Sequence, residues 1–302
     1  MERSNETMSD TVIQVDNLCH SYGGKDVLRG LSFEVKKGRI FGLLGKNGAG
    51  KSTTINIMMG FLSPKGGVCR IFGEPSHSLR PETRARIGLL HETFLQYEFL
   101  TIGQAETFYA SFYPMWNHGV FRDLMDRLGL PDNRKIHRMS CGQRSQVTLA
   151  LILAQMPELM ILDDYSLGLD AGYRRLFLDY LLDYAERYGT TILITSHIVQ
   201  DLERFVDDIV ILDQGRTLVS SSLQGFTDGF RCYGLPRNGG KKPVQDGIIA
   251  RTECLGDRQY LYSFESQDVV REHLAASGMD AAGLAPVSMT LEDAFIGLTG
   301  KY

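Results

Sequence analysis

The sequence predicts an α/β fold with a parallel sheet, followed by a small α+β domain. The first observation is a set of apolar runs bounded by turn residues, at positions 39–45, 159–163, 191–196 and 209–213. Because these runs are continuous rather than alternating, they are typical of strands covered on both faces. The second observation is that helical patterns lie between them, such as TTINIMMGFL and YRRLFLDYLLDYAERYG, the latter ending at Gly189 as a helix stop. Strands that alternate with helices indicate a parallel sheet.

Two regions depart from this alternation. Residues from about 95 to 145 are rich in aromatic and helix-forming residues without a clear buried strand, which predicts a helical subdomain. After Ser220 come a loop-like RNGGKKP, the strand-like GIIARTE and QYLYSF, and the helical SQDVVREHLAASG. In the final TLEDAFIGLTG, Thr290 and Asp293 have capping-box spacing before an apolar run. We therefore expect one domain over residues 1–219 and an α+β accessory domain over residues 220–302.

Composition narrows the possible functions. The chain has 302 residues, a net charge of -4 and no long Lys/Arg run, so a nucleic-acid partner is not expected. Its five cysteines form no CxxC pair, which predicts neither a zinc site nor a disulfide framework. No apolar segment approaches the roughly 20 residues of a spanning helix, and MERSNETMSD lacks a signal core. We expect an intracellular protein that reaches a membrane only through a partner.

The stretch GKNGAGKS, from Gly45 to Ser52, predicts a phosphate-binding loop. It follows the apolar strand RIFGLL and precedes a helical pattern, which is the context that this motif requires. Its glycines let backbone N–H groups surround phosphate oxygens, Lys51 supplies a positive charge, and Ser52 offers a hydroxyl to Mg²⁺. The nucleotide-binding residues expected here are Gly45, Asn47, Gly48, Ala49, Gly50, Lys51, Ser52 and Thr53. The alternative is a glycine-rich turn without a ligand.

An acid at the end of a buried strand would complete the metal site. Asp163 follows the run LMIL and meets that requirement, although it could instead be a solvated aspartate at a strand end. The loop and the aspartate together predict a P-loop NTPase.

Three further motifs make the sequence resemble the ATP-binding subunits of ABC transporters. MSCGQ at 139–143 lies upstream of LMILDDYSLGLD, and TSH follows at 195–197. The resemblance covers residues 12 to about 216 and follows the family's motif order. The tail, above all LEDAFIGLTG, is similar to the C-terminal extension of exporter-type ATP-binding subunits.

The resemblance implies a role for each motif, with ATP and Mg²⁺ as cofactors. Tyr22 would stack on adenine, although a tyrosine before Gly-Gly can also be a simple turn residue. In a head-to-tail dimer, Ser140 and Gly142 of one subunit would bind the γ-phosphate held by the other, and Ser140 can serve as a helix N-cap as well. His197 would contact the γ-phosphate and the attacking water. Gln143 and Asp170 are the remaining expected nucleotide contacts.

The sequence departs from the family pattern at several of these positions. Glu92 stands where the family usually has glutamine; it can bind Mg²⁺ or its water, or it is a surface acid if the register is off by one. Cys141 replaces a frequent glycine in the signature. Tyr165 replaces a frequent proline, which removes a backbone constraint. Asp164 occupies the place of the usual catalytic glutamate and is shorter by one methylene, so slow but real hydrolysis is expected.

The leading hypothesis is an ATPase that drives export through separate transmembrane subunits, paired with a second copy or a paralogue on the cytoplasmic face of the membrane. The alternative is a degenerate regulatory subunit that hydrolyses ATP weakly or not at all. A soluble ATPase acting on ribosomes or DNA would predict tandem cassettes or a charged coiled-coil insertion, and the sequence has neither. The aromatic segment FYASFYPMW, residues 108–116, is expected either near a groove for a membrane-subunit helix or in the helical core.

Overall fold

The computed structural model describes residues 10–91, 97–166, 168–196, 198–237 and 245–300. The chain forms two compact units. The first consists of Met1–Ile198 and Phe205–Ser220, and the second of Val199–Arg204 and Ser221–Tyr302.

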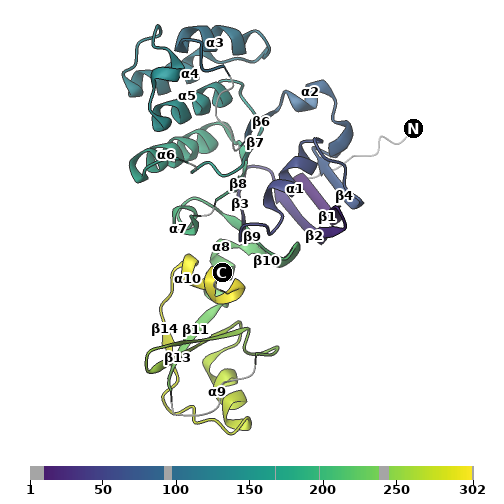
Figure 1. Ribbon diagram of the computed structural model, residues 1–302, viewed down its shortest axis with the longest axis vertical. Helices are drawn as coiled ribbons and strands as arrows, with labels where there is room; N and C mark the ends of the chain where they lie inside the picture. Colours follow the sequence, from purple (N-terminus) through teal and green to yellow (C-terminus); the bar gives the residue numbers. More distant parts are fainter. Residues whose placement is uncertain (1–9, 92–96, 167, 197, 238–244, 301–302) are drawn as a thin grey trace, which may run out of the picture. The chain divides into compact units, whose positions relative to one another are not determined.

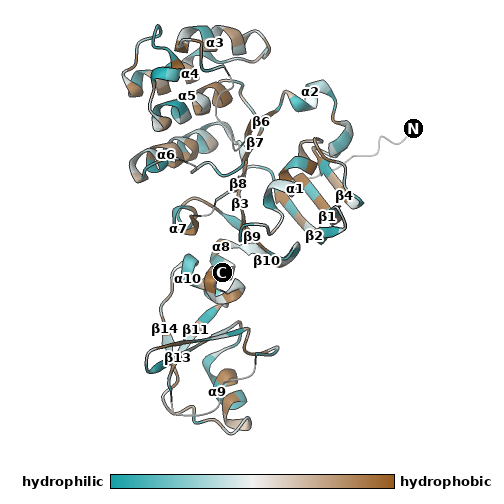
Figure 2. Ribbon diagram, viewed as in Figure 1, coloured by the Kyte–Doolittle hydropathy of each residue, from teal (hydrophilic) through white to brown (hydrophobic). Residues whose placement is uncertain are grey.

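A six-stranded sheet with the order β10-β9-β3-β8-β7-β6 runs through the first unit. Its strands are β3 (Ile40–Gly45), β6 (Ile87–Leu90), β7 (Leu159–Leu162), β8 (Thr191–Thr195), β9 (Asp208–Asp213) and β10 (Arg216–Ser222). The pairs β6·β7, β7·β8, β3·β8 and β3·β9 are parallel, which confirms the predicted parallel sheet. The four apolar runs of the sequence form β3, β7, β8 and β9. Hydrophobic residues concentrate on these central strands (Figure 2), and β3, β7 and β8 are buried along their whole length.

Helices cover both faces of this sheet. The helix α1 (Lys51–Met58) lies on one side, and α5 (Cys141–Leu153) and α6 (Ala171–Tyr188) lie on the other (Figure 1). The α6 helix ends at Gly189, which adopts a left-handed conformation as predicted for a helix stop. The short helices α2 (Pro81–Arg84), η1 (Ser76–Ser78) and η2 (Ile136–Arg138) belong to connections.

A second, antiparallel sheet with the order β2-β1-β4-β5 was not expected from the sequence. Its strands are β1 (Thr11–Tyr22), β2 (Lys25–Lys36), β4 (Gly66–Ile71) and β5 (Glu74–Pro75). In β2, the buried Leu31, Phe33 and Val35 alternate with exposed residues, because only one face of this sheet is covered. That face shares a core with α1 and the central strands.

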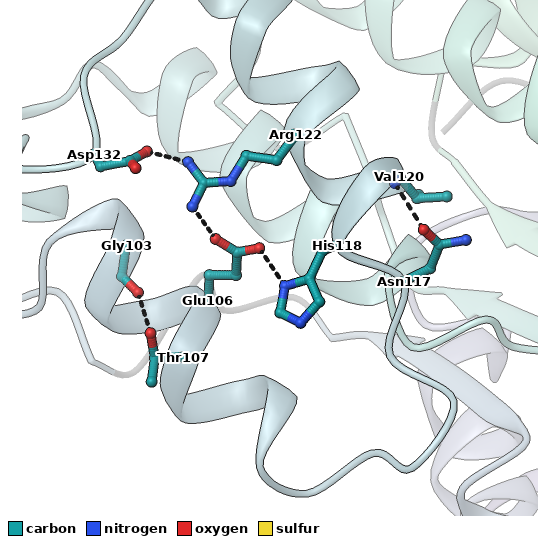
Figure 3. Close-up of polar contacts among 8 residues, drawn as sticks. All are labelled: Gly103, Glu106, Thr107, Asn117, His118, Val120, Arg122 and Asp132. Atoms are coloured by element: carbon teal, nitrogen blue, oxygen red, sulfur yellow. Dashed lines mark hydrogen bonds and ion pairs between the residues drawn. The ribbon is translucent and has the colours of Figure 1, made fainter.

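The segment expected to be helical contains α3 (Ile102–Ala110), α4 (His118–Leu128) and the start of α5. A buried carboxylate joins the first two helices (Figure 3). Glu106 of α3, only 4% exposed, accepts a hydrogen bond from Arg122 of α4 and lies 2.9 Å from His118 Nδ1. Arg122 also pairs with Asp132, and these carboxylates raise the pKa of its guanidinium.

The second unit is an α+β structure. An antiparallel sheet with the order β12-β13-β11-β14 is formed by β11 (Arg231–Pro236), β12 (Arg251–Leu255), β13 (Arg258–Ser263) and β14 (Ala285–Val287). Its helices are α7 (Val199–Leu202), α8 (Leu223–Gly229), α9 (Gln267–Ala276) and α10 (Leu291–Thr299). The α10 helix begins with the predicted capping box of Thr290 and Asp293. The core forms where α9 packs on the sheet, around Tyr233, Leu261 and Leu274.

Within the described part of the chain, no helix combines the length and the apolar character needed to cross a membrane.

The buried carboxylate of Glu106 generates a first prediction. Glu106→Ala leaves Arg122 without its buried partner, but this arginine is partly exposed and can be rehydrated, so we expect the free energy of unfolding to fall by about 1–3 kcal/mol. The measurement is urea unfolding followed by the fluorescence of Trp116, the single tryptophan, whose ring lies 6.3 Å from that of Phe121 in α4. As a control, Asp179→Ala removes an exposed ion pair with Arg175 on α6 and should cost at most about 0.5 kcal/mol. Equal losses in the two variants would contradict a stabilising role for Glu106.

Candidate ATP-binding site

A cavity of about 670 Å³ opens where the central strands end. It brings together many residues that the sequence assigns to nucleotide, metal and catalysis: Tyr22, Asn47, Gly48, Gly50, Lys51, Ser52, Thr53, Asp163 and Asp164. Because parallel strands end at the same edge of a sheet, the loops after β3 and β7 meet there although their residues are far apart in sequence.

The loop between β3 and α1 depends on glycine at defined positions. Gly48 and Gly50 have φ angles of 80° and 109°, which residues with a side chain rarely adopt. A Cβ on Gly50 would lie 2.6 Å from Leu28 Cδ2, and a Cβ on Gly45 would lie 3.0 Å from both Ala49 Cβ and Leu212 O. Gly45 and the buried Ala49 therefore support the loop from beneath rather than line the cavity. Such a tight loop, opening onto a helix N-terminus, is suited to surround phosphate oxygens.

Lys51 is the positively charged residue that follows the phosphate loop in this cavity. Its Nζ donates to Gly45 O at 2.6 Å and to Lys46 O at 3.2 Å, so the side chain curls back over the loop. Burial lowers the pKa of Lys51, because desolvation disfavours its charged form, and the carboxylates of Asp163 and Asp164 oppose this effect. The ammonium thus lies over the phosphate loop, with two negative charges nearby.

Asp163, at the end of β7, is 3% exposed. Its Oδ1 accepts a hydrogen bond from the hydroxyl of Thr195 at 2.8 Å. Its Oδ2 is buried and has no hydrogen-bond partner among the described residues. An unsatisfied buried carboxylate oxygen in a cavity that also contains the Ser52 hydroxyl fits Mg²⁺, a cation that prefers oxygen ligands. In the described parts of the chain no cluster of three or more His, Cys, Asp or Glu side chains could hold a metal, so an ion here would share its coordination with phosphate or water.

Asp164 has a left-handed backbone, with φ at 46°. Its N–H donates to Thr195 Oγ1 at 2.9 Å, and its Oδ1 accepts a hydrogen bond from Ser166 at 3.1 Å. The next residue, Tyr165, is 2% exposed and stacks on Phe177 with ring centroids 5.4 Å apart. The expectation that replacing proline by Tyr165 frees the backbone is therefore wrong, because the buried ring anchors the chain beside Asp164.

Tyr22 ends β1 and is 49% exposed. The ring meets His20 edge-on, at 4.8 Å between centroids, which leaves an aromatic surface at the cavity. This geometry suits stacking on a planar base.

The signature residues lie apart from this cavity, at the starts of two neighbouring helices. Ser140 N-caps α5 in a capping box with Gln143, so its N-cap role is confirmed. Gly142 is buried against α6, where a Cβ would lie 2.3 Å from the ring of Tyr173. Asp170 N-caps α6 by accepting a hydrogen bond from the N–H of Tyr173 at 2.9 Å. None of these residues lines the phosphate-loop cavity of its own chain.

Two predicted site residues, Glu92 and His197, lie outside the described residues. Seven other described residues that line the cavity were not predicted as site residues, namely Lys25, Asp26, Val27, Arg29, Thr195, Ser196 and Gln214. Lys25 and Arg29 belong to β2, in the antiparallel sheet that the sequence did not predict. Thr195 was recognised only as part of a strand and of the TSH motif, and the signal for its role is its register beside Asp163.

The chain is similar to known proteins over most of its length. A family model described as ABC transporter matches residues 28–166. The chain is 30% identical to the Nod factor export ATP-binding protein I of Rhizobium johnstonii, over 100% of this chain and 99% of that protein. It is 28% identical to the protein of the same name from Paraburkholderia xenovorans, over 97% and 99% of the two chains.

Solved structures show the same fold. A structure of the ATP-binding subunit of an ABC transporter has a TM-score of 0.65 and 28% identity, and covers 72% of this chain and 92% of its own. The dimeric structure of a bacterial ABC transporter cassette has a TM-score of 0.61 and 23% identity, and covers 70% and 98%.

The chain therefore belongs to the ATP-binding subunits of ABC transporters. It is an ATPase of this family, which couples ATP hydrolysis to transport.

Nucleotide binding generates the second prediction. Lys51→Ala removes the cation from the phosphate loop, and because hydrogen bonds to charged groups contribute about 1.5–3 kcal/mol each, we expect it to abolish measurable ATP binding. Isothermal titration of the purified protein with ATP checks this. Lys36→Ala, an exposed lysine at the end of β2, is the control and should bind normally. Wild-type affinity in Lys51→Ala would overturn the assignment of the loop.

Proposed function

We propose that this chain is the ATP-hydrolysing subunit of an exporter, acting as a head-to-tail dimer on the cytoplasmic face of a membrane. The observation that carries the proposal is that Lys51, Ser52, Asp163 and Asp164 share one cavity. The relatives are named export ATP-binding proteins and span nearly the whole chain, including the second of the two proposed domains, residues 220–302. The alternative of a regulatory subunit without hydrolysis is not favoured by these relatives.

The proposed dimer is supported by the distance in the fold between the phosphate-loop cavity and the signature residues. Ser140, Gly142, Gln143 and Asp170 contribute nothing to their own chain's cavity, so in the proposal they complete the cavity of a second subunit, either a copy or a paralogue. Ser140 accepts the N–H of Gln143 at 3.2 Å, and its hydroxyl proton remains available to a phosphate oxygen. Capping and phosphate binding are thus compatible in one side chain.

In the proposed site, Ser52 and Asp163 hold Mg²⁺, with Glu92 as a further ligand. The ion neutralises charge that develops on the phosphates. Lys51 binds the outer phosphates, and Tyr22 stacks on the base. Asp164 acts as the general base toward the attacking water, and His197 contacts the γ-phosphate.

The role of Asp164 generates the third prediction. Asp164→Asn keeps the size of the side chain but cannot accept a proton, so we expect ATP binding to persist, turnover to fall by about a hundredfold or more, and the closed dimer to accumulate. Turnover of both proteins is measured with and without the membrane subunit, and size-exclusion chromatography with ATP reports the dimer. Asp183→Asn, an exposed acid of α6, is the control. Equal turnover in wild type and Asp164→Asn would remove Asp164 from catalysis and support the regulatory subunit instead.

An aromatic surface of the first unit is proposed as the docking site for a helix of the membrane subunit. A groove of about 650 Å³ is lined by Phe61, Tyr109 and Tyr113, among others. Beside it, Phe108 and Phe112 pack edge to face, 5.1 Å apart, and Phe112 is 63% exposed. Exposed aromatic rings beside a groove are typical anchors for a partner helix.

Trp116 differs from the rest of the segment at residues 108–116. Its Nε1 is buried without a hydrogen-bond partner in the described structure, and its ring packs near Phe121. In the proposal, Trp116 therefore contributes to the packing of the helical subdomain rather than to the docking surface.

The difference between the exposed Phe112 and the packed Trp116 leads to the fourth prediction. Phe112→Ala should weaken co-purification with the membrane subunit roughly tenfold, equivalent to about 1.4 kcal/mol, and should leave ATP binding and stability intact. Trp116→Ala should instead lower the thermal stability. Leu255→Ala, equally exposed but in the second unit, is the matched control for Phe112. Normal capture of the membrane subunit by Phe112→Ala would exclude this docking site.

A further inference from the structure

Thr195 occupies the position between the phosphate loop and the two aspartates. It is the last residue of β8, which lies between β3 and β7 in the central sheet. Because Leu162 pairs with Ile194, the residues that follow, Asp163 and Thr195, come side by side at the ends of their strands. Thr195 lines the cavity although its side chain is fully buried.

The hydroxyl of Thr195 bridges both aspartates. It accepts the N–H of Asp164 at 2.9 Å and donates its own proton to Asp163 Oδ1 at 2.8 Å. A hydroxyl has one proton and two acceptor lone pairs. Because the N–H of Asp164 can only donate and the carboxylate of Asp163 accepts, the hydroxyl proton is directed to the carboxylate, and the orientation of the bridge is fixed.

This bridge determines which oxygen of Asp163 remains for a metal ion. Oδ1 is held by Thr195, so the carboxylate plane is fixed and Oδ2, the oxygen without a partner among the described residues, is the one left to coordinate. The same bridge holds the left-handed backbone from which the Asp164 side chain projects.

We propose that Thr195 is a positioning residue, which orients Asp163 Oδ2 for Mg²⁺ and fixes the backbone of Asp164 for catalysis. The inference rests on the proposed function of this cavity. Groups that hydrogen-bond a metal ligand fix its orientation, and their loss typically costs about 10–100-fold in metal affinity.

Two other buried threonines, Thr54 and Thr191, direct their hydroxyls to backbone groups. Thr54 donates to the backbone carbonyl of Gly50 at 2.9 Å, which satisfies the hydroxyl within its own helix. Thr191, at the opposite end of β8, accepts the N–H of Gly38 at 2.9 Å. Thr195 instead directs its only proton to a carboxylate. Thr191 is a matched control, because it has the same residue type, strand and burial.

The experiment is a Mg²⁺ titration of ATP binding by the purified full-length chain, using isothermal titration at fixed free Mg²⁺ concentrations and in EDTA. Thr195→Val keeps the shape of the side chain and removes the hydroxyl. We expect it to raise the Mg²⁺ concentration for half-maximal enhancement of ATP binding by about 10–100-fold, while ATP binding in EDTA stays unchanged. Thr195→Ser retains the hydroxyl and should restore the wild-type value. Thr191→Val should also behave like wild type.

An unchanged Mg²⁺ dependence in folded Thr195→Val would overturn the proposal, and so would an equal shift in Thr191→Val. If Thr195→Val does not fold, Thr195→Ala is subjected to the same titration and the same criteria. Failure of the proposed function gives a different result, because the wild type itself would then show no Mg²⁺-dependent ATP binding.

Discussion

The buried carboxylate of Asp163 is the constraint on which the site depends. A charge with so little exposure is costly unless nearby groups compensate for it, and the protein supplies only part of this compensation. Thr195 satisfies Oδ1, and Lys51 adds a positive charge, but Oδ2 remains unsatisfied within the described structure. The strand order β3-β8-β7 places these three groups in sequence along one edge of the sheet. The end of the central sheet therefore contains a buried carboxylate whose charge a divalent cation would compensate.

The residues proposed to contact a second subunit also have structural roles in their own chain. Ser140 and Asp170 each satisfy the first turn of a helix and also lie at the surface, where a second subunit can be reached. Gly142 is required because α5 and α6 approach too closely for any side chain. Helix packing thus fixes the spacing of Ser140 and Asp170. In the proposed dimer, the stability of one subunit and its complementarity to the second subunit would depend on the same residues.

Sequence patterns predicted the parts of the fold that local chemistry determines. The continuous apolar runs correctly predicted β3, β7, β8 and β9, and the capping-box spacing correctly predicted the start of α10. The antiparallel sheet was not predicted because strands such as β2 alternate buried and exposed residues, whereas the strands predicted for the first unit were continuous apolar runs. Arg29 lies in β2 and was therefore not predicted as a cavity residue. The importance of Thr195 depends on the register between β7 and β8, which no local pattern reveals. Tyr165 was misinterpreted because its buried stacking on Phe177 is a tertiary contact.

The backbone at Asp164 gives a physical reason why aspartate can stand where the family usually has glutamate. Left-handed conformations are several-fold enriched in aspartate relative to most other side-chain-bearing residues, and φ here is 46°. Aspartate therefore relieves local strain at this turn, although its carboxylate reaches less far. The buried ring of Tyr165 prevents the chain from shifting to recover that distance, and Thr195 holds the N–H from the other side. These contacts fix the backbone from which the carboxylate projects. In the proposed mechanism, the rate of hydrolysis depends on how closely this carboxylate approaches the γ-phosphate.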